Sequence, residues 1–266
     1  MTMTLLAILA ATLLAGVGSV WLAALLGFGI LARYTQHMLS LAAGALLATA
    51  FMHLLPEAFE SQVSADQLFP TLLVGLIFFF LLDKAELWHH GHEHHHGHDH
   101  AHVHSHDHAD GQTPARPGGS WAILTGDSVH CFGDGVLIAS AFVADMRLGV
   151  VAALAVLMHE VPHHMGDLVV LRQASDNRRM ALVKVSLAGG LTALGGVVGF
   201  FLVAQLEAYL PFFLAIASSS FLYVALADLI PQLQKKLSAR ETLAQIVWLT
   251  VGIGMVTLAS SLTHSH

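Results

Sequence analysis

Several side chains that bind metal ions stand close together inside an apolar stretch. Residues 159–167 read His-Glu-Val-Pro-His-His-Met-Gly-Asp, within an apolar run from Leu148 to Leu171. Ionisable groups at bilayer depth are costly unless they face a protein interior, where they usually serve a function. Residues four apart share a helix face, which pairs His159 with His163 and Glu160 with His164, and places Asp167 one turn beyond His163. Imidazole and carboxylate groups together suit a borderline divalent cation.

A second polar set lies in the preceding apolar run, from Trp121 to Ala144. His130 and Asp134 are four residues apart, and Asp127 extends their face by one turn, although it could instead cap a helix. We expect these two segments to form helices that bind one cation between them. His164 and Asp167 either bind the cation or orient the groups that do. His53, in an earlier segment, could complete the coordination or line the path of the ion.

Composition identifies the elements that hold this site. The chain has 266 residues, 55% hydrophobic and 11% charged, whereas soluble domains carry about 25% charged residues. Eight apolar segments are near the ~20 residues that cross a bilayer: Leu5–Ile30, Leu39–Pro56, Phe69–Trp88, Trp121–Ala144, Leu148–Leu171, Ala181–Leu206, Leu210–Pro231 and Leu243–Leu262. Backbone groups in lipid must bond within their own segment, so the prediction is an all-α integral membrane protein with eight transmembrane helices. The first segment is interpreted as a retained span and not as a cleaved signal.

The chain divides into four parts. Residues 1–88 hold helices one to three, 89–120 form a His-rich loop, 121–172 hold helices four and five with the metal site, and 173–266 hold helices six to eight. The stretch from His89 to His108 has twelve histidines in twenty residues. It cannot form a core and is predicted to be disordered, and its imidazoles are predicted to bind divalent metals. An artificial tag is the alternative, but the interleaved acidic residues do not suit one.

Basic residues predict the orientation. With the N-terminus outside, inner loops hold ten of the eleven Lys and Arg residues, and only Arg147 lies outside. This asymmetry follows the positive-inside rule. It places both termini outside and the His-rich loop in the cytoplasm. We expect a multi-pass protein of the plasma membrane, which is the bacterial inner membrane if the source is a bacterium.

A short internal match suggests a repeat. His53-Leu54-Leu55-Pro56-Glu57 and Asp228-Leu229-Ile230-Pro231-Gln232 share one pattern: a polar residue, two apolar residues, proline and a polar residue. Helices 1–3 and 6–8 would then match with opposite polarity around helices 4 and 5, an inverted 3+2+3 repeat. Such repeats are typical of transporters, with the substrate near the midplane.

Two other functions fit parts of the pattern. His159-Glu160-Val161-Pro162-His163 matches H-E-x-x-H, in which two histidines bind zinc and the glutamate activates water, so an intramembrane zinc metalloprotease is the alternative. Pro162 disturbs the turn that would carry those ligands, and eight spans suit transport better. A metal sensor without flux is the third reading. We favour transport of Zn²⁺, or of Fe²⁺, Mn²⁺ or Cd²⁺, as substrate, and expect no enzyme activity, no catalytic cofactor and no nucleic-acid partner.

Over essentially its whole length the chain resembles the ZIP (Zrt/Irt-like) divalent metal transporters. The resemblance rests on eight spans, the His-rich third loop, His53 to Glu57, His130-x-x-x-Asp134-Gly135, and His159 to His163. It implies that His130, Asp134, His159, Glu160 and His163 are ligands and that Asp134 can bridge two metal positions. It also implies import into the cytoplasm, movement of spans 1, 4, 5 and 6 against spans 2, 3, 7 and 8, and a homodimer in many members.

This chain departs from the family at several site positions. Many members have Asn at Cys131, Pro at Gly133 and Glu at Asp134; many bacterial members have Glu at His163; and the most similar subgroup has Glu at His164. The loss of carboxylates lowers the negative charge of the site, which argues against a two-metal centre and against a preference for iron or manganese. The added imidazole favours zinc.

Overall fold

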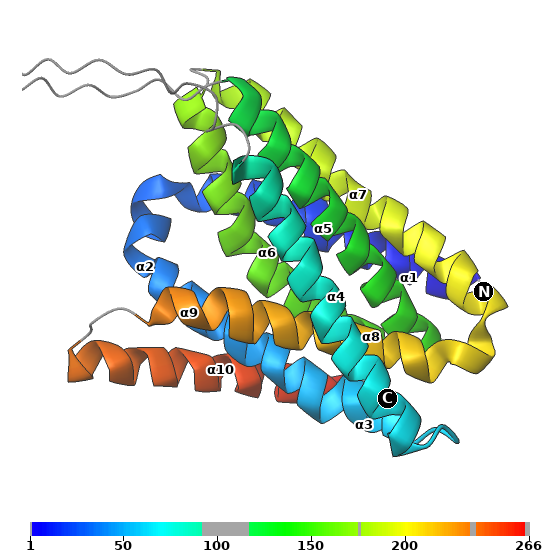
Figure 1. Cartoon of the computed structure of the whole chain (residues 1–266). Coiled ribbons are helices and arrows are strands. Elements are labelled where there is room, and N and C mark those ends of the chain that lie inside the picture. The colour runs from blue at the N-terminus through cyan, green and yellow to red at the C-terminus, as the bar shows by residue number, and fades with distance from the viewer. Residues whose placement is uncertain (1, 92–116, 175–176, 235–237, 264–266) are drawn as a thin grey trace, which may run out of the picture.

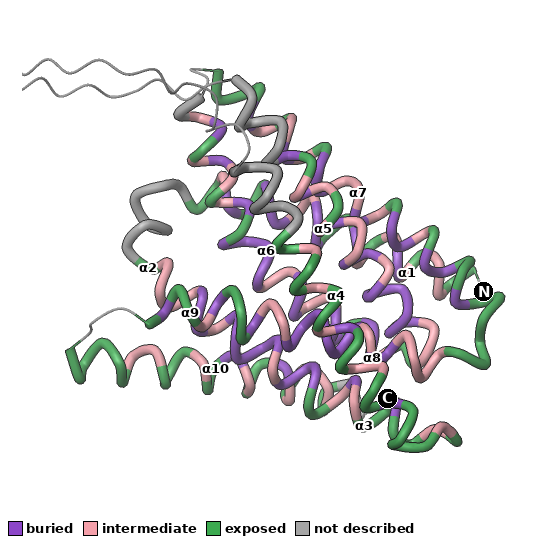
Figure 2. Tube along the Cα trace, in the orientation of Figure 1, coloured by how far each residue is buried: buried purple, intermediate pink, exposed green. Residues whose placement is uncertain are grey.

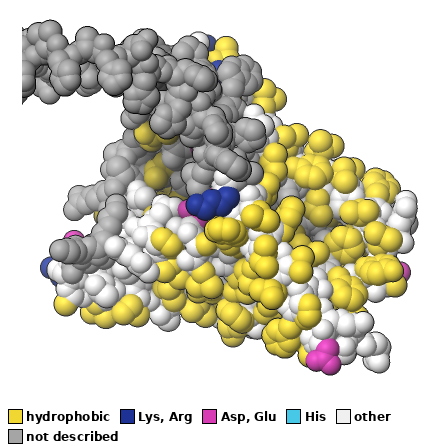
Figure 3. Space-filling view, in the orientation of Figure 1, with side chains coloured by type: hydrophobic (Ala, Val, Ile, Leu, Met, Phe, Trp, Pro, Cys, Tyr) yellow, Lys and Arg dark blue, Asp and Glu magenta, His cyan; other side chains and the backbone are white. Residues whose placement is uncertain are grey.

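The computed structural model describes residues 2–91, 117–174, 177–234 and 238–263, and every element in these ranges is helical. Eight described helices are long and apolar enough to cross a membrane: Thr2–Leu26, Tyr34–Phe59, Ala65–Lys84, Leu124–Ala144, Met146–Arg172, Arg178–Gln205, Glu207–Leu233 and Ala239–Leu262. Each overlaps one predicted span, so the eight-helix prediction is confirmed. Hydrophobic side chains are spread widely over the described part of the face shown in Figure 3, and charged ones are sparse there.

The elements follow one another with few breaks (Figure 1). They are α1 Thr2–Leu13, η1 Leu14–Gly18, α2 Ser19–Thr49, η2 Ala50–Leu54, α3 Leu55–Phe59, α4 Ala65–Gly91, α5 Pro117–Ala144, α6 Met146–Ala174, α7 Arg178–Gln205, η4 Glu207–Tyr209, α8 Leu210–Tyr223, η5 Val224–Leu229, α9 Ile230–Leu233 and α10 Ala239–Thr263. Helix α2 contributes to both the first and the second span and curves between them. Most of the predicted His-rich loop lies outside the described residues, while α4 extends to Gly91 and α5 begins at Pro117.

The spans form two bundles. The site bundle contains α1, α5, α6 and α7, in which α5 packs most extensively on α7. The scaffold bundle contains the second-span part of α2 with α3, α4, α8, α9 and α10, in which α2 packs on α10 and α4 on α8. Close backbone approach at glycine holds each bundle together, since lipid supplies little hydrophobic drive for association. A Cβ at Gly195 of α7 would collide with Phe132 of α5, and one at Gly44 of α2 with Leu249 of α10.

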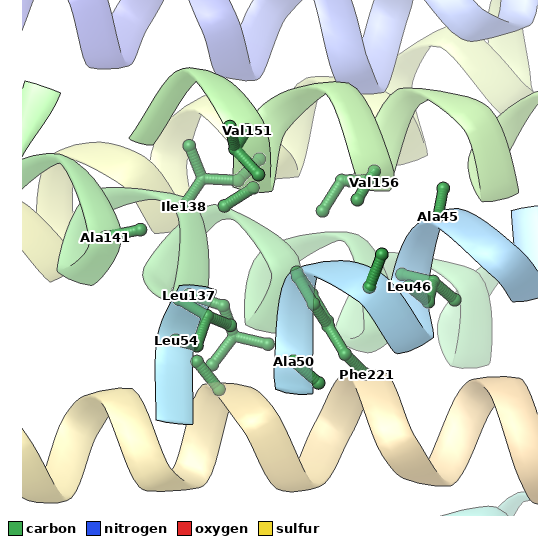
Figure 4. Packing of buried hydrophobic residues seen from close by; sticks show 14 of the residues in the cluster. Ala45, Leu46, Ala50, Leu54, Leu137, Ile138, Ala141, Val151, Val156 and Phe221 are labelled. Atoms are coloured by element: carbon green, nitrogen blue, oxygen red, sulfur yellow. The ribbon is translucent and has the colours of Figure 1, made fainter. Parts of the chain in front are cut away.

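An apolar cluster fills the space between the bundles (Figure 4). It takes Leu46, Ala50 and Leu54 from the scaffold bundle, Leu137, Ile138, Ala141, Val151 and Val156 from α5 and α6, and Phe221 from α8. All are buried, in contrast to the exposed outer faces of α4 and α10 (Figure 2). On α5 and α6 the cluster occupies the segments nearest the short α5–α6 junction. It therefore closes the molecule on that side of the polar residues.

Two π-helical turns occupy matching places in the predicted repeat. η2 contains His53 and is followed by Pro56, and η5 contains Asp228 and is followed by Pro231. Proline lacks an N–H donor and clashes with the carbonyl one turn back, and π turns relieve such sites within helices. The two segments run in opposite directions in Figure 1. This correspondence supports the inverted repeat.

Candidate metal site

Helices α5 and α6 bring four predicted ligands around one point. The first cluster contains His130 and Asp134 from α5 and His159 and Glu160 from α6. His159 Nε2 lies 3.2 Å from Asp134 Oδ2 and 3.1 Å from Glu160 Oε1. His130 Nε2 lies 3.4 Å from both Glu160 Oε1 and His159 Nε2, and 3.9 Å from Asp134 Oδ2. The four groups thus face one another at distances that a single ion can span.

Two carboxylate oxygens of this cluster lack a hydrogen-bond donor in the described part of the chain. Asp134 Oδ2 and Glu160 Oε1 are buried, and neither has a hydrogen-bond partner among the described residues. A buried charged acceptor without a donor costs more than the ~1–3 kcal/mol of a neutral one. His159 Nδ1 lies 3.3 Å from the carbonyl oxygen of Ala155 in its own helix, and donation there leaves the Nε2 lone pair facing the cluster. A cation at the centre would satisfy both oxygens and both imidazoles.

A second cluster lies beside the first and shares Glu160. It contains Asp127 and Cys131 of α5 and Glu160 and His164 of α6, all buried. His164 Nε2 lies 3.1 Å from Glu160 Oε2, 3.6 Å from Asp127 Oδ1 and 3.7 Å from Cys131 Sγ. Cys131 Sγ lies 3.6 Å from Asp127 Oδ1 and 3.8 Å from Glu160 Oε2. The two oxygens of Glu160 therefore face different clusters.

His163 lies apart from the first cluster, to which the family resemblance assigns it. Its Nδ1 is 3.7 Å from Asp127 Oδ1 and 3.5 Å from Asp167 Oδ2, and these three residues form a third group. Its ring stacks on His130 with centroids 5.4 Å apart. The side chain is 39% exposed. His163 and Asp167 thus lie at the open edge of the site, and Asp127, embedded in α5, contacts two histidines instead of capping a helix end.

His53 does not join these groups. It lies on the η2 turn of the scaffold bundle and lines a different cavity with Glu57, Glu60 and Asp145. Leu148 and Val151 of α6, which belong to the apolar cluster, line this cavity as well. This arrangement gives no support to the expectation that His53 completes the central coordination. His53 lies toward the end of the molecule that holds the α5–α6 junction.

A cavity of about 200 Å³ leads to the site from the other end. From the site bundle it is lined by Asp127, His130, His159 and His163, and from the scaffold bundle by Asp83, Tyr223, Asp228 and Gln232. The Tyr223 hydroxyl donates to Asp83 Oδ2 at 3.0 Å, and Gln232 Nε2 donates to Asp228 Oδ1 at 2.8 Å. The cavity is thus a polar passage between the two bundles.

Two side chains of the site were not expected from the sequence. Cys131 was not among the predicted ligands, although it stands four residues after Asp127, a spacing that could have placed it among them. Ser19 of α2 contacts His164 Nδ1 through its hydroxyl at 2.9 Å. These two residues are 145 positions apart, and no local spacing indicates their contact.

Comparison with known proteins finds a matching family and several similar proteins. The family model described as ZIP Zinc transporter matches residues 83–260. Zinc transporter ZIP13 from Pongo abelii is 28% identical over 247 residues, which cover 86% of this chain and 68% of that protein. Zinc transporter ZIP4 from Homo sapiens is 35% identical over 136 residues, which cover 51% of this chain and 20% of that protein.

Proposed function

The chain belongs to the ZIP zinc transporter family, and we propose that it carries Zn²⁺ across a membrane into the cytoplasm through the first cluster. Neither the family nor the zinc transporters among its relatives support the alternative of an intramembrane metalloprotease. His130, Asp134, His159 and Glu160 hold the ion in this proposal, and His163, His164, Asp127 and Asp167 surround it.

The observation that carries the proposal is the geometry of the first cluster. Zinc binds imidazole nitrogen and carboxylate oxygen at about 2.0–2.2 Å in a tetrahedron, whose edges are then about 3.3–3.6 Å. Five donor-to-donor distances in the cluster fall between 3.1 and 3.9 Å. Two imidazoles with two carboxylates suit zinc better than the harder ions, which prefer oxygen ligands.

The direction of transport follows from the open side and the basic residues. The ends of α4, α6 and α9 and the starts of α7 and α10 all lie on the left side of Figure 1, opposite the α5–α6 junction. Lys84, Arg172, Arg178, Arg179 and Arg240 belong to these ends. The positive-inside rule makes this end cytoplasmic, so the cavity opens inward and the apolar cluster closes the outer side. Both termini then lie outside, with the protein in the plasma membrane.

Transport requires the site to open to the other side, and the packing supports movement of one bundle against the other. Among the described glycines, every position where a Cβ would collide with another helix joins helices of the same bundle, as Gly16 does with Gly189 and Gly252 with Leu41. Between the bundles lie side-chain contacts of alanine, valine and leucine. All proposed ligands belong to the site bundle, so they can move together with the ion.

Zinc uptake into vesicles that contain the purified protein tests the proposal. We expect Asp134→Ala and His159→Ala to abolish uptake, while Asp66→Ala, which removes an exposed carboxylate at the start of α4, leaves it at the parent rate. Uptake by both site variants at the parent rate would disprove the site. Cleavage of a membrane substrate that is lost in Glu160→Gln, without zinc flux, would support the protease instead.

A further inference from the structure

We propose that Ser19 of α2 is a positioning residue for the first cluster, and that it acts through His164 to fix the direction in which the Glu160 carboxylate faces. Ser19 itself binds no metal. The inference deepens the proposed function and rests on it for the identity of the ion. It adds a third helix, α2, to the two helices that supply the ligands.

The contact between Ser19 and His164 has one possible donor. The Ser19 hydroxyl lies 2.6 Å from the carbonyl oxygen of Gly16, an acceptor only, so its single hydrogen is donated there. The contact of 2.9 Å between Ser19 Oγ and His164 Nδ1 then requires Nδ1–H as the donor. Both side chains are 0% exposed, so bulk water cannot replace either partner. Ser19 therefore holds the imidazole ring of His164 in one orientation.

His164 passes this orientation on to a ligand. Its Nε2 lies 3.1 Å from Glu160 Oε2, closer than to Asp127 Oδ1 at 3.6 Å or Cys131 Sγ at 3.7 Å. One proton between this nitrogen and Glu160 Oε2 makes the contact a hydrogen bond, whichever atom carries it. The carboxylate is planar, so holding Oε2 also fixes where Oε1 points.

The second oxygen of Glu160 points into the first cluster. Glu160 Oε1 lies 3.1 Å from His159 Nε2 and 3.4 Å from His130 Nε2. A ligand that is held through its other oxygen loses less freedom when the ion binds, and such supporting contacts typically change metal affinity about 10–100-fold. Two consecutive contacts thus connect Ser19 to the proposed zinc site.

The local structure of the first span supports a dedicated role for Ser19. The π turn η1 ends directly before it, and the Ser19 N–H donates to the carbonyl oxygen of Leu14, five residues back. A π turn adds one residue to a helical turn and rotates the following side chains by about 100°. The π turns η2 and η5 each precede a proline, but no proline follows η1 within α2. Turning Ser19 toward α6 gives this π turn a function.

Packing against α7 holds the π turn in place. A Cβ at Gly16 would collide with the carbonyl oxygen of Gly189, so the backbones of the first span and α7 touch there. Gly16 also supplies the acceptor for the Ser19 hydroxyl. The residue that orients His164 is therefore itself fixed from two sides.

Zinc uptake into vesicles that contain the full-length protein tests the role of Ser19. We expect Ser19→Ala to raise the zinc concentration for half-maximal uptake about tenfold, while the maximal rate stays near that of the parent. A merely structural loss would reduce the amount of folded protein, and so the maximal rate, without changing the half-saturation. Ser19→Thr should recover most of the affinity, because a threonine hydroxyl in a helix can also bond a carbonyl one turn back.

Ser40→Ala is the matched control. Ser40 is a buried serine of the same helix, and its hydroxyl donates to the carbonyl oxygen of Gln36 in its own turn. We expect this variant to keep the half-saturation of the parent. An equal half-saturation in Ser19→Ala and Ser40→Ala would overturn the inference.

A double-mutant cycle tests the route through His164. If Ser19 acts through this ring, Ser19→Ala should cause no further loss of affinity in a His164→Ala background, because coupled residues are not additive. A tenfold loss in both backgrounds would show that Ser19 acts independently of His164 and would overturn the proposed route.

A second measurement separates this inference from the proposed function. A ligand that binds the folded protein stabilises it, so the zinc dependence of the thermal unfolding temperature reports binding without transport. Parent vesicles that accumulate no zinc would refute transport. The same tenfold shift between Ser19→Ala and Ser40→Ala in the unfolding titration would still support the role of Ser19, and its absence there would overturn it.

Discussion

Replacing Gly195 by alanine should impair zinc binding although Gly195 binds no metal. Gly195 of α7 packs on Phe132 of α5, which stands between His130 and Asp134. A Cβ there would collide with the Phe132 carbonyl oxygen and lie 2.9 Å from its carbon, whereas ordinary contact begins at 3.4 Å. Helices α5 and α7 must therefore separate by at least about 0.5 Å, since backbone atoms cannot turn aside.

This displacement exceeds the tolerance of the first cluster. Metal–ligand distances hold within about 0.2 Å, and His130 and Asp134 would shift relative to the two ligands on α6. We expect the zinc concentration for half-maximal uptake to rise about tenfold, equivalent to about 1.4 kcal/mol. Overpacking should also lower the free energy of unfolding by about 1–3 kcal/mol.

Gly190 offers a matched control on the same helix. A Cβ at Gly190 meets nothing within 4 Å, so Gly190→Ala should transport like the parent, and its stability should be equal or slightly higher because alanine favours helix. Zinc uptake into vesicles and thermal unfolding measure both variants. If Gly195→Ala retains the half-saturation of the parent, the reasoning that links α7 packing to ligand geometry is wrong.

Three further predictions concern the cavity and its closure. His163→Ala should weaken zinc uptake less than His159→Ala, because His163 Nδ1 faces Asp127 and Asp167 at the open edge instead of the centre of the first cluster; equal losses in half-saturation would contradict this. Phe221→Ala removes a ring that is 1% exposed from between the bundles and should lower the free energy of unfolding by about 3 kcal/mol. Thermal unfolding measures this loss, and Phe78→Ala, which removes a ring on an exposed face, is the control. Gln232 lines the inward cavity, so the cysteine in Gln232→Cys should react with an impermeant maleimide only when the cytoplasmic side is accessible. Labelling from the outside alone would contradict the proposed membrane orientation.

The spans and the two site helices could be predicted from sequence because their signals are local. A bilayer requires about 20 apolar residues in each span, and the four-residue spacing of His130 with Asp134 shows a shared helix face without knowledge of the partner. The structure places both His130 and Asp134 within the α5–α6 pair, as expected. Local spacing does not show how the two helices are rotated relative to each other. That rotation divides the predicted ligands into three groups.

The residues that sequence reasoning missed or misplaced depend on contacts between distant segments. Ser19 reaches His164 only because α2 packs on α6. His163 was assigned by family pattern to the same ion as His159, but its position on α6 turns it toward Asp167. His53 shares a sequence pattern with Asp228, and the two residues lie on matching π turns of the scaffold bundle, away from the first cluster.

The exclusion of His53 from the central site bears on how an ion could move. If ligands came from both bundles, each displacement of one bundle against the other would have to break bonds to the ion. Every proposed ligand instead lies on α5 or α6, and Ser19, which supports His164, begins the first-span part of α2 beside them. The coordination can then persist while the site bundle moves, and the scaffold bundle contributes only walls.

His53 in the outer cavity and Asp228 in the inner one stand on those walls, where they can meet the ion before binding and after release. A ligand added from the scaffold bundle should therefore trap the ion. Ser220 of α8 lines the inward cavity beside His130 and His159, and Ser220→His is expected to tighten zinc binding while slowing zinc uptake.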